Sequence, residues 1–232
     1  GLAVVHVGDD PATRRYVEHK RSDCEDVGIA FELVDPDPET SREELDAIIA
    51  DLNADDDIDG ILVQSDVPDH VDWQDAVERV DPLKDVDGLH PENVGRLVAG
   101  RPRYEPCTPA GIRWLLADAG VPITGADVVI VNRSDIVGKP LANMLLADRE
   151  DGNATVTVCH SHTEDLAAKT RSADILVVAV GKPEFIDGSM VSDGTTVVDV
   201  GISSVERDGE TTIVGDVEYD TVEPNCDALV PV

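Results

Sequence analysis

Short apolar runs alternate with segments of helical spacing along the whole chain. The apolar runs predict strands at residues 2–8, 29–35, 60–64, 127–132, 154–161, 174–181 and 195–202. Apolar positions at helical spacing, often opened by Pro, Ser or Thr, predict helices at residues 11–28, 41–54, 72–80, 108–120, 138–150 and 164–173. Continuous apolar strands that alternate with helices are typical of parallel sheets covered on both faces. The pattern therefore predicts the α/β class.

A stretch punctuated by Pro and Gly, from residue 81 to residue 106, separates two such series of strands and helices. A chain of 232 residues can bury either one large core or two small ones. We expect two α/β domains with mostly parallel sheets, residues 1–106 and residues 107–232. The second series predicts a Rossmann-like dinucleotide-binding domain.

The charge of the chain is strongly one-sided. Asp and Glu number 49 against 18 Lys and Arg, a formal net charge of −31, and the acidic residues are spread over both halves. A surface of this kind stays hydrated in molar salt, where the self-repulsion is screened, so a halophilic source is predicted. Nucleic-acid binding needs a basic footprint and is not expected.

Other composition features point to a soluble cytoplasmic protein that holds no metal. No apolar run is long enough to span a bilayer, and the first residues lack the pattern of a signal peptide. The four cysteines are widely spaced with no Cys-x-x-Cys pair, which favours reduced thiols over zinc or disulfides. The chain begins directly on a strand-like run, so we expect it to be truncated.

A strand-to-helix turn in the second half is a candidate cofactor site. It carries Asn132, Arg133 and Ser134 where a dinucleotide fold usually places glycines, while Gly138 allows close packing of helix and strand. The next predicted strand ends near Ser161 with no carboxylate at its tip, although an NAD site usually has one there to bind the ribose hydroxyl. A neutral tip and a nearby arginine favour NADP over NAD.

The first half places a second set of candidates at the ends of its strands and on its first helix. Tyr16 and Lys20 are four residues apart and therefore share a helix face. Gln64 ends the third predicted strand, and Asp87 precedes Gly88 in the connection to the second domain. A packed tyrosine beside a solvated lysine remains an alternative for the first pair. Lysine is rare in this chain, however, which favours a functional role.

These segments together resemble the methylenetetrahydrofolate dehydrogenase/cyclohydrolase family. The resemblance runs in order through "VGDDPATRRYVEHK", "DIDGILVQ", "KDVDGLHPENVGRL", "PCTPAGI", "NRSDIVGKP", "ATVTVCHS", "DILVVAVGKPEFI", "VVDVGI" and "VGDV". It implies a bifunctional enzyme of one-carbon metabolism that acts on tetrahydrofolate derivatives. The enzyme would oxidise the methylene form to the methenyl form with NADP, then hydrolyse it to the formyl form in the same cleft.

The resemblance also implies roles for the candidates of the first domain. Tyr16 would border the folate, and Lys20 would be the key catalytic residue of the hydrolytic step. Gln64 would bond to Lys20 and tune its protonation, and Asp87 would hold the pterin ring. A lysine held in a closed cleft can have its pKa lowered towards neutrality and so exchange protons usefully.

For the second domain the resemblance implies the cofactor contacts and the assembly. Arg133, Ser134 and Ser161 would hold the NADP phosphates, with Gly181 and Ile202 near the nicotinamide end. A homodimer through the cofactor domain is implied as well.

The chain departs from the family pattern in three places. Ser65 and Asp66 follow the strand-end Gln64 where Leu-Pro is frequent, and Asn132 replaces a frequent Gly. The family's closing Pro-Gly-Gly-Val-Gly-Pro segment and final helix are absent, as is a preceding N-terminal helix, so truncation at both ends is expected.

Several alternatives remain. A dehydrogenase of the shikimate dehydrogenase kind can carry an Asn-Arg turn, but after the second strand of its cofactor domain instead of the first. A short-chain dehydrogenase places Tyr-x-x-x-Lys after its cofactor glycines and in the same domain. A non-catalytic folate- or nucleotide-binding protein and a monofunctional dehydrogenase are the other two.

Overall fold

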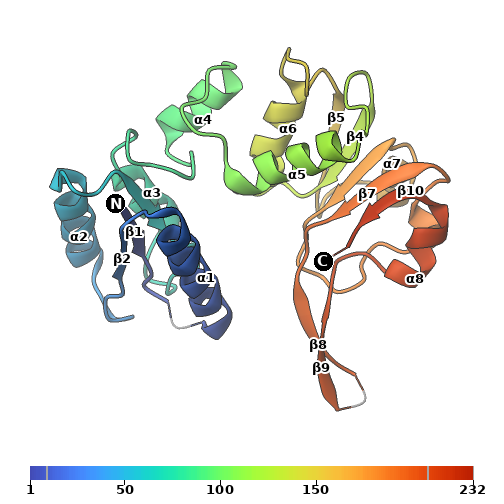
Figure 1. Cartoon of the computed structure of the whole chain (residues 1–232). Coiled ribbons are helices and arrows are strands. Elements are labelled where there is room, and N and C mark those ends of the chain that lie inside the picture. The colour runs from blue at the N-terminus through green and yellow to red at the C-terminus, as the bar shows by residue number, and fades with distance from the viewer. Residues whose placement is uncertain (9, 208, 232) are drawn as a thin grey trace. The chain divides into compact units, whose positions relative to one another are not determined.

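The computed structural model describes residues 1–8, 10–207 and 209–231. Its contacts divide the chain into two compact units, Gly1–Glu105 and Pro106–Val232. Each unit is built around its own parallel sheet flanked by helices (Figure 1). The predicted α/β class is therefore confirmed.

The first unit contains a parallel sheet in the order β2-β1-β3, which places the first strand in the middle. Its strands are β1 (Leu2–Val5), β2 (Phe31–Val34) and β3 (Gly60–Val63), and its helices are α1 (Pro11–Val27), α2 (Arg42–Ala54), α3 (Trp73–Arg79) and α4 (Pro91–Val98). Because all three strands run in the same direction, their carboxyl ends meet at one edge of this sheet. The residues that follow them, including Gln64, lie at that edge.

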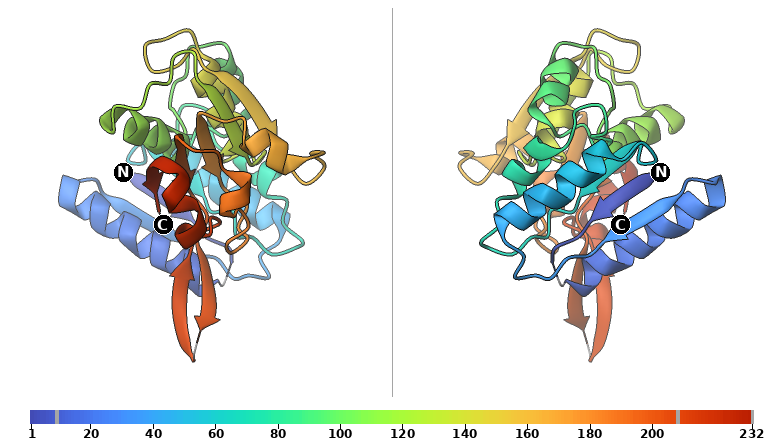
Figure 2. Two further views of the ribbon diagram at one scale, coloured as in Figure 1. Left: turned by 90° about the vertical axis from the view of Figure 1, so that its right-hand side faces the viewer. Right: turned by 90° about the vertical axis from the view of Figure 1, so that its left-hand side faces the viewer.

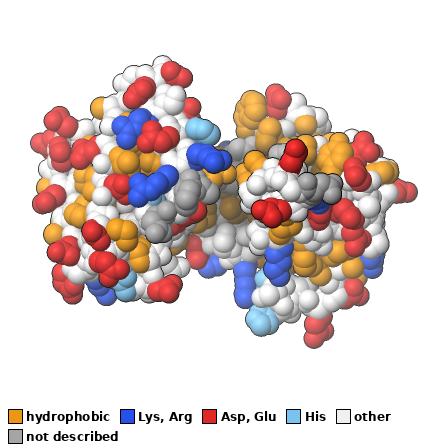
Figure 3. Space-filling model, turned by 90° about the horizontal axis from the view of Figure 1, so that it is seen from below, with side chains coloured by type: hydrophobic (Ala, Val, Ile, Leu, Met, Phe, Trp, Pro, Cys, Tyr) orange, Lys and Arg blue, Asp and Glu red, His pale blue; other side chains and the backbone are white. Residues whose placement is uncertain are grey.

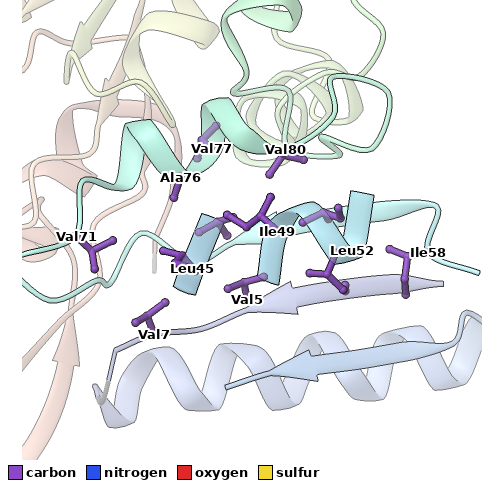
Figure 4. Close-up of a cluster of buried hydrophobic side chains, with 13 residues drawn as sticks. Val5, Val7, Leu45, Ile49, Leu52, Ile58, Val71, Ala76, Val77 and Val80 are labelled. Carbon is purple, nitrogen blue, oxygen red and sulfur yellow. The ribbon is translucent and has the colours of Figure 1, made fainter. Parts of the chain in front are cut away.

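Hydrophobic side chains cover both faces of the first sheet. On one face Val5 packs against Leu45 and Ile49 of α2, and the same cluster reaches α3 (Figure 4). On the other face Val4 packs with Val17 of α1. The alternation of successive strand residues between the two faces follows from the pleat of the strand. Helix α1 is thereby packed on the sheet through its apolar side, and its polar side takes no part in this core.

The second unit has the strand order β10-β7-β6-β4-β5, again parallel throughout. Its main elements are α5 (Cys107–Asp118), β4 (Asp127–Val131), α6 (Gly138–Leu146), β5 (Thr155–Cys159), α7 (Leu166–Thr170), β6 (Ile175–Val178), β7 (Thr195–Asp199), α8 (Tyr219–Val222) and β10 (Cys226–Val230). Short 3₁₀ turns occupy Gly188–Met190 and Glu223–Asn225. The strand order reverses between β4 and β6, and in a doubly wound sheet ligands bind beyond the strand ends at such a point.

The two faces of this second sheet also bury separate clusters. Val128 and Ile130 pack with Leu141 of α6 on one face, while Val129 and Val131 join a second cluster on the other. Strands buried on both sides have few polar positions, which explains why these runs stood out in the sequence.

Some elements differ from the sequence prediction. Helix α4 forms where a Pro- and Gly-punctuated connection was expected, because Pro91 occupies the first helical turn and the His90 side chain accepts a bond from Glu92 N. Helix α6 ends at Leu146 and not at residue 150. The strands β8 (Ser203–Arg207) and β9 (Glu210–Val214) form an antiparallel hairpin that the periodicity did not predict, and Figure 2 shows it projecting from its unit.

Acidic side chains are distributed over the surface. In Figure 3 the Asp and Glu side chains are scattered over both units, with apolar side chains between them. Within the described residues no helix combines the length and apolar character needed to cross a membrane.

Candidate active site

Helix α1 presents Tyr16 and Lys20 from its polar side. Tyr16 is 50% exposed, Lys20 is partly buried, and Val17 between them is buried against the sheet. The four-residue spacing places the two side chains one helical turn apart, as expected. The phenol and the ammonium group are therefore displayed together from an element whose other side is fixed in the core.

Gln64 directly follows β3, and the segment that contains Asp87 runs beside this strand. A parallel bridge pairs Ile61 with Asp85, and Ile61 N donates to Lys84 O at 2.7 Å. The chain turns after this bridge, where Gly88 N donates to Asp85 O at 3.3 Å, and Asp87 lies in that turn. The structure thus places Asp87 two residues beyond a backbone contact with β3, the strand that Gln64 follows.

The side-chain amide of Gln64 is incompletely satisfied. Its Nε2 atom is buried and has no hydrogen-bond partner among the described residues. The implied bond between Gln64 and Lys20 is likewise not formed among those residues. Because buried polar atoms in native proteins nearly always have partners, an orphaned donor of this kind indicates a place where a ligand or water binds.

Asp87 is electrostatically coupled to Lys20. Burial raises the pKa of Asp87 to about 6, the charge of Lys20 opposes this rise, and repulsion from Asp85 adds to it. The Asp87 side chain is partly exposed to solvent, but protein atoms make up most of its surroundings. The coupling places Lys20 and Asp87 near each other, while Gln64 follows β3 at the carboxyl edge of the sheet.

A buried polar network holds the segment that carries Asp87. The Asp85 side chain is 3% exposed and accepts bonds from Asn93 Nδ2 at 2.7 Å and from His90 N at 2.8 Å. Arg103 in turn donates to the Asn93 side-chain oxygen. No sequence signal marked Asn93 and Arg103, because no periodic pattern links a turn residue, a residue of α4 and a residue of the following loop.

In the second unit, Asn132 organises the turn after β4. Its Oδ1 accepts bonds from Ser134 N at 2.7 Å, from Ser134 Oγ at 2.8 Å and from Gly138 N at 2.9 Å. Its Nδ2 donates to the carbonyl oxygen of Ala179, which follows β6. The side chain therefore bridges the point where the strand order reverses. Asparagine in place of glycine is explained by this bracing of the turn.

Gly138 is required where helix α6 meets this turn. A Cβ atom added to Gly138 would lie 2.2 Å from the carbonyl oxygen of Asn132. We therefore expect Gly138→Ala to destabilise the fold by about 1–3 kcal/mol through overpacking and to weaken cofactor binding. Gly111→Ala is the matched control, because a Cβ there meets nothing within 4 Å in the exposed middle of α5. The control should be neutral or stabilising by about 0.5–1 kcal/mol in denaturant titrations. Equal losses in both variants would contradict the close-approach argument.

The predicted phosphate ligands fall into two groups. Arg133 and Ser161 are exposed, so both are available to a ligand. Ser134 differs from the expectation, because its hydroxyl donates its one proton to Asn132 and accepts from Val137 N at 3.0 Å. Ser134 therefore builds the turn, and the groups free to face a phosphate are Arg133 and Ser161.

The loop that contains Gly181 is held by two buried carboxylates. Asp216 is fully buried and accepts bonds from the backbone N–H groups of Gly181 at 2.9 Å and Lys182 at 2.6 Å. Asp199 accepts from Asp216 N at 3.0 Å. Burial raises the pKa of Asp199, although three backbone N–H bonds oppose the rise. The sequence motifs around these aspartates were quoted in the resemblance, but their structural role was not predicted.

Gly181 and Ile202 complete the predicted cofactor set. Gly181 has φ +64°, a left-handed conformation that suits glycine, and a Cβ there would meet nothing within 4 Å, so its surroundings are open. Ile202 is 54% exposed and follows β7 after Gly201. Both therefore lie just beyond strands β6 and β7, at the carboxyl edge where a doubly wound sheet binds its ligand.

The two units define a class of protein. One is a doubly wound parallel sheet with an exposed cation at its reversal point, and the other has a lysine coupled to a carboxyl and a buried, unsatisfied amide at the end of a strand. This combination is that of a two-domain dinucleotide-dependent enzyme. The chain belongs to the tetrahydrofolate dehydrogenase/cyclohydrolase family: residues 1–87 match the model of its catalytic domain and residues 106–232 that of its NAD(P)-binding domain.

Individual relatives agree with this assignment. The bifunctional protein FolD of Natronomonas pharaonis is 57% identical, with 100% of this chain and 79% of that protein covered. The FolD structure from Campylobacter jejuni, a methylenetetrahydrofolate dehydrogenase/cyclohydrolase, is 43% identical with a TM-score of 0.92, covering 100% of this chain and 80% of that one. Relatives from halophilic archaea support the halophilic source expected from the charge.

A third similar protein was solved with a cofactor. The structure of the Trypanosoma brucei enzyme, complexed with NADP and an inhibitor, is 33% identical with a TM-score of 0.92, covering 100% of this chain and 79% of that one. A shikimate dehydrogenase structure, by contrast, is 14% identical with a TM-score of 0.58, covering 98% of this chain and 83% of that one. At this identity the likeness extends to the fold alone, and the shikimate dehydrogenase alternative is set aside.

Proposed function

We propose that this protein oxidises methylenetetrahydrofolate to the methenyl form with NADP and then hydrolyses the product to formyltetrahydrofolate. The observation that carries the proposal is the sheet edge of the first unit. There the carboxyl of Asp87 is coupled to Lys20, and the buried amide of Gln64 lacks a partner among the described residues. A folate ring supplies both hydrogen-bonding groups and a reacting carbon for such a set.

In the hydrolytic step, water adds to the methenyl carbon and one carbon–nitrogen bond breaks. Both protons leave the water oxygen as the formyl carbonyl forms: one is released to solvent, and the other must reach the departing nitrogen. The Lys20 amine takes and returns this proton, which is the role of a general base and then a general acid. Gln64 bonds to Lys20 or to the substrate through the amide group that is otherwise unsatisfied, and this orients the pair for reaction.

In the oxidative step, bound NADP supplies the hydride acceptor. Asp87, whose raised pKa of about 6 leaves a fraction protonated near neutrality, hydrogen-bonds the pterin ring, and the exposed Tyr16 ring borders it. Arg133 and Ser161 bind the cofactor phosphates, with Asn132, Ser134 and Gly138 shaping the turn. Gly181 and Ile202 lie at the nicotinamide end. This assigns folate binding to residues 1–106 and cofactor binding to residues 107–232.

The protein acts as a cytoplasmic homodimer in this proposal. The four cysteines form no disulfide among the described residues, which suits a reducing compartment. The projecting β8–β9 hairpin carries Ile213 at 62% exposure, which supports burial of this hairpin by a second copy.

The test is turnover of methylenetetrahydrofolate by the purified protein in molar potassium chloride. Reduction of NADP and of NAD is recorded side by side while the absorbance of the methenyl product is followed. The proposal expects rapid NADP reduction with little build-up of the methenyl form. Build-up without hydrolysis would indicate a monofunctional dehydrogenase, and no turnover would indicate a non-catalytic binder.

The preference for NADP should depend on Arg133. We expect Arg133→Gln to raise the KM for NADP by about 10- to 100-fold, because a charge-assisted bond to phosphate is lost, and to leave the KM for NAD within about twofold. Arg101→Gln, an exposed arginine of the first unit, is the control and should change neither value. An equal rise in KM for NADP and for NAD would show that Arg133 does not recognise the phosphate that distinguishes NADP.

A further inference from the structure

His6 is a buried histidine held between two carboxylates. It directly follows β1 and is 1% exposed. Its Nδ1 lies 3.1 Å from Asp35 Oδ1 and its Nε2 lies 3.3 Å from Asp66 Oδ2. Asp35 directly follows β2, and Asp66 lies on the segment after β3. The imidazole ring therefore joins the ends of all three strands in the first sheet.

Both nitrogens of the His6 ring face carboxylates. A neutral imidazole has one N–H, whereas an ionised carboxylate only accepts hydrogen bonds, so a neutral ring could bond to one of the two aspartates. The imidazolium form donates to both. Burial raises the pKa of Asp35, but bonds from Arg14 and His6 outweigh this and lower the pKa overall. Each of the two ring nitrogens of His6 therefore contacts a carboxylate of its own.

The contacts continue to helix α1. Arg14 Nη1 lies 2.9 Å from Asp35 Oδ2. The resulting chain of side chains, Arg14–Asp35–His6–Asp66, alternates basic and acidic residues; we call it the strand-end relay. One end is on the helix that carries Lys20, six residues after Arg14, and the other is two residues after Gln64.

The residues around Asp66, at one end of the relay, are closely packed. A Cβ added to Gly8 would lie 2.3 Å from Asp66 Oδ1, so this carboxylate rests directly on the loop that leads into α1. From the other side, Trp73 Nε1 of α3 donates to Val63 O at 3.0 Å, immediately before Gln64. The relay is therefore part of a rigid support for the end of β3.

We propose that the strand-end relay positions the hydrolytic pair, by fixing the helix that carries Lys20 relative to the segment that carries Gln64. This inference rests on the proposed function. Arg14, Asp35, His6 and Asp66 are positioning residues, since none of them needs to touch the substrate. Hydrolysis depends on the separation of Lys20 and Gln64, whereas oxidation depends on the alignment of the folate with the cofactor, so the two activities should respond differently.

The test compares Arg14→Gln, Asp66→Ala and the double variant. Small misplacements of catalytic groups are costly, so each single variant should lower kcat for methenyltetrahydrofolate hydrolysis by about 10- to 100-fold. The KM for that substrate and the kcat for oxidation should stay within about threefold. Because both changes break one chain of contacts, the double variant should lose little more than the worse single variant.

Two further variants separate positioning from stability. Asp66→Asn retains an oxygen acceptor for His6 and should recover most of the hydrolytic rate. Arg42→Gln is the matched control, because it removes an ion pair to Asp75 of 2.8 Å that joins α2 to α3 in the same unit without reaching Gln64. It should leave hydrolysis unchanged. Thermal unfolding is measured for every variant.

The outcomes are distinct. Unchanged hydrolysis in Arg14→Gln and Asp66→Ala, or equal losses of hydrolysis and oxidation that follow the fall in unfolding temperature, would overturn the inference and leave the relay a structural feature. Absence of hydrolysis in the wild-type protein would instead overturn the proposed function.

Discussion

Lys20→Ala should abolish hydrolysis of methenyltetrahydrofolate, with kcat lowered by about 10²- to 10⁴-fold, the range lost when a positioned acid–base group is removed. The amine that moves the proton is deleted, while the cofactor unit is untouched. NADP reduction should therefore continue, although more slowly because Asp87 loses its neighbouring cation. The measurement is the methenyl absorbance, which should accumulate in the variant and not in the wild type.

Lys169→Ala serves as the control, since Lys169 is an exposed lysine of α7 in the other unit. It should hydrolyse the substrate at the wild-type rate. Retention of full hydrolysis by Lys20→Ala would exclude Lys20 as the acid–base group and leave Asp87 and Tyr16 as the remaining titratable candidates of the set.

Asp87→Asn is expected to produce a more stable but poorly active protein. The pKa of Asp87 in the folded protein is about 6, above its ordinary value of 3.8, so the folded state binds more protons than the unfolded state between these values. Stability contributed by this group is present at low pH and is lost as pH rises through about 6. The neutral amide removes that loss. We expect a gain on the order of 2 kcal/mol near pH 7.5 and no gain near pH 4, from the shift of roughly two pKa units.

Denaturant titrations at the two pH values measure this difference, and Asp69→Asn, at an exposed site in the same unit, should show no such pH-dependent gain. Activity should move in the opposite direction, with kcat/KM for methylenetetrahydrofolate falling by about 10- to 100-fold, since the pterin loses a charged partner. If Asp87→Asn were less stable than the wild type near pH 7.5, burial of the Asp87 carboxylate would not be destabilising the folded protein. Unchanged kcat/KM would remove it from the folate site.

Strands and helices whose own residues carry a full apolar run or a helical periodicity were predicted well. The run at residues 127–132 became β4 (Asp127–Val131), because a strand buried on both faces must be apolar at every position. Helix α1 spans Pro11–Val27, against an expected 11–28. The hairpin β8–β9 was missed since its strands are largely exposed, and exposed strands carry no apolar run.

The candidate site divides in the same way. Tyr16 and Lys20 are related by helical spacing alone, so their common face could be predicted from the sequence. The position of the Asp87 segment against β3 depends on the bridge between Ile61 and Asp85, which no local pattern encodes. The contacts of Ser134 could not be predicted for a related reason: whether its hydroxyl bonds within its own turn depends on the position of Asn132 Oδ1.

By itself the sequence determined the α/β class, the family, the acidic surface and the residue types of both sites, because periodicity, composition and ordered motifs are properties of the chain. The tertiary structure alone decided which of those residues meet. The orphaned amide of Gln64, the coupling of Asp87 to Lys20 and the clamp of His6 between Asp35 and Asp66 all join residues from separate strands and loops. Such contacts are set by strand order and register, which bring distant positions to one sheet edge.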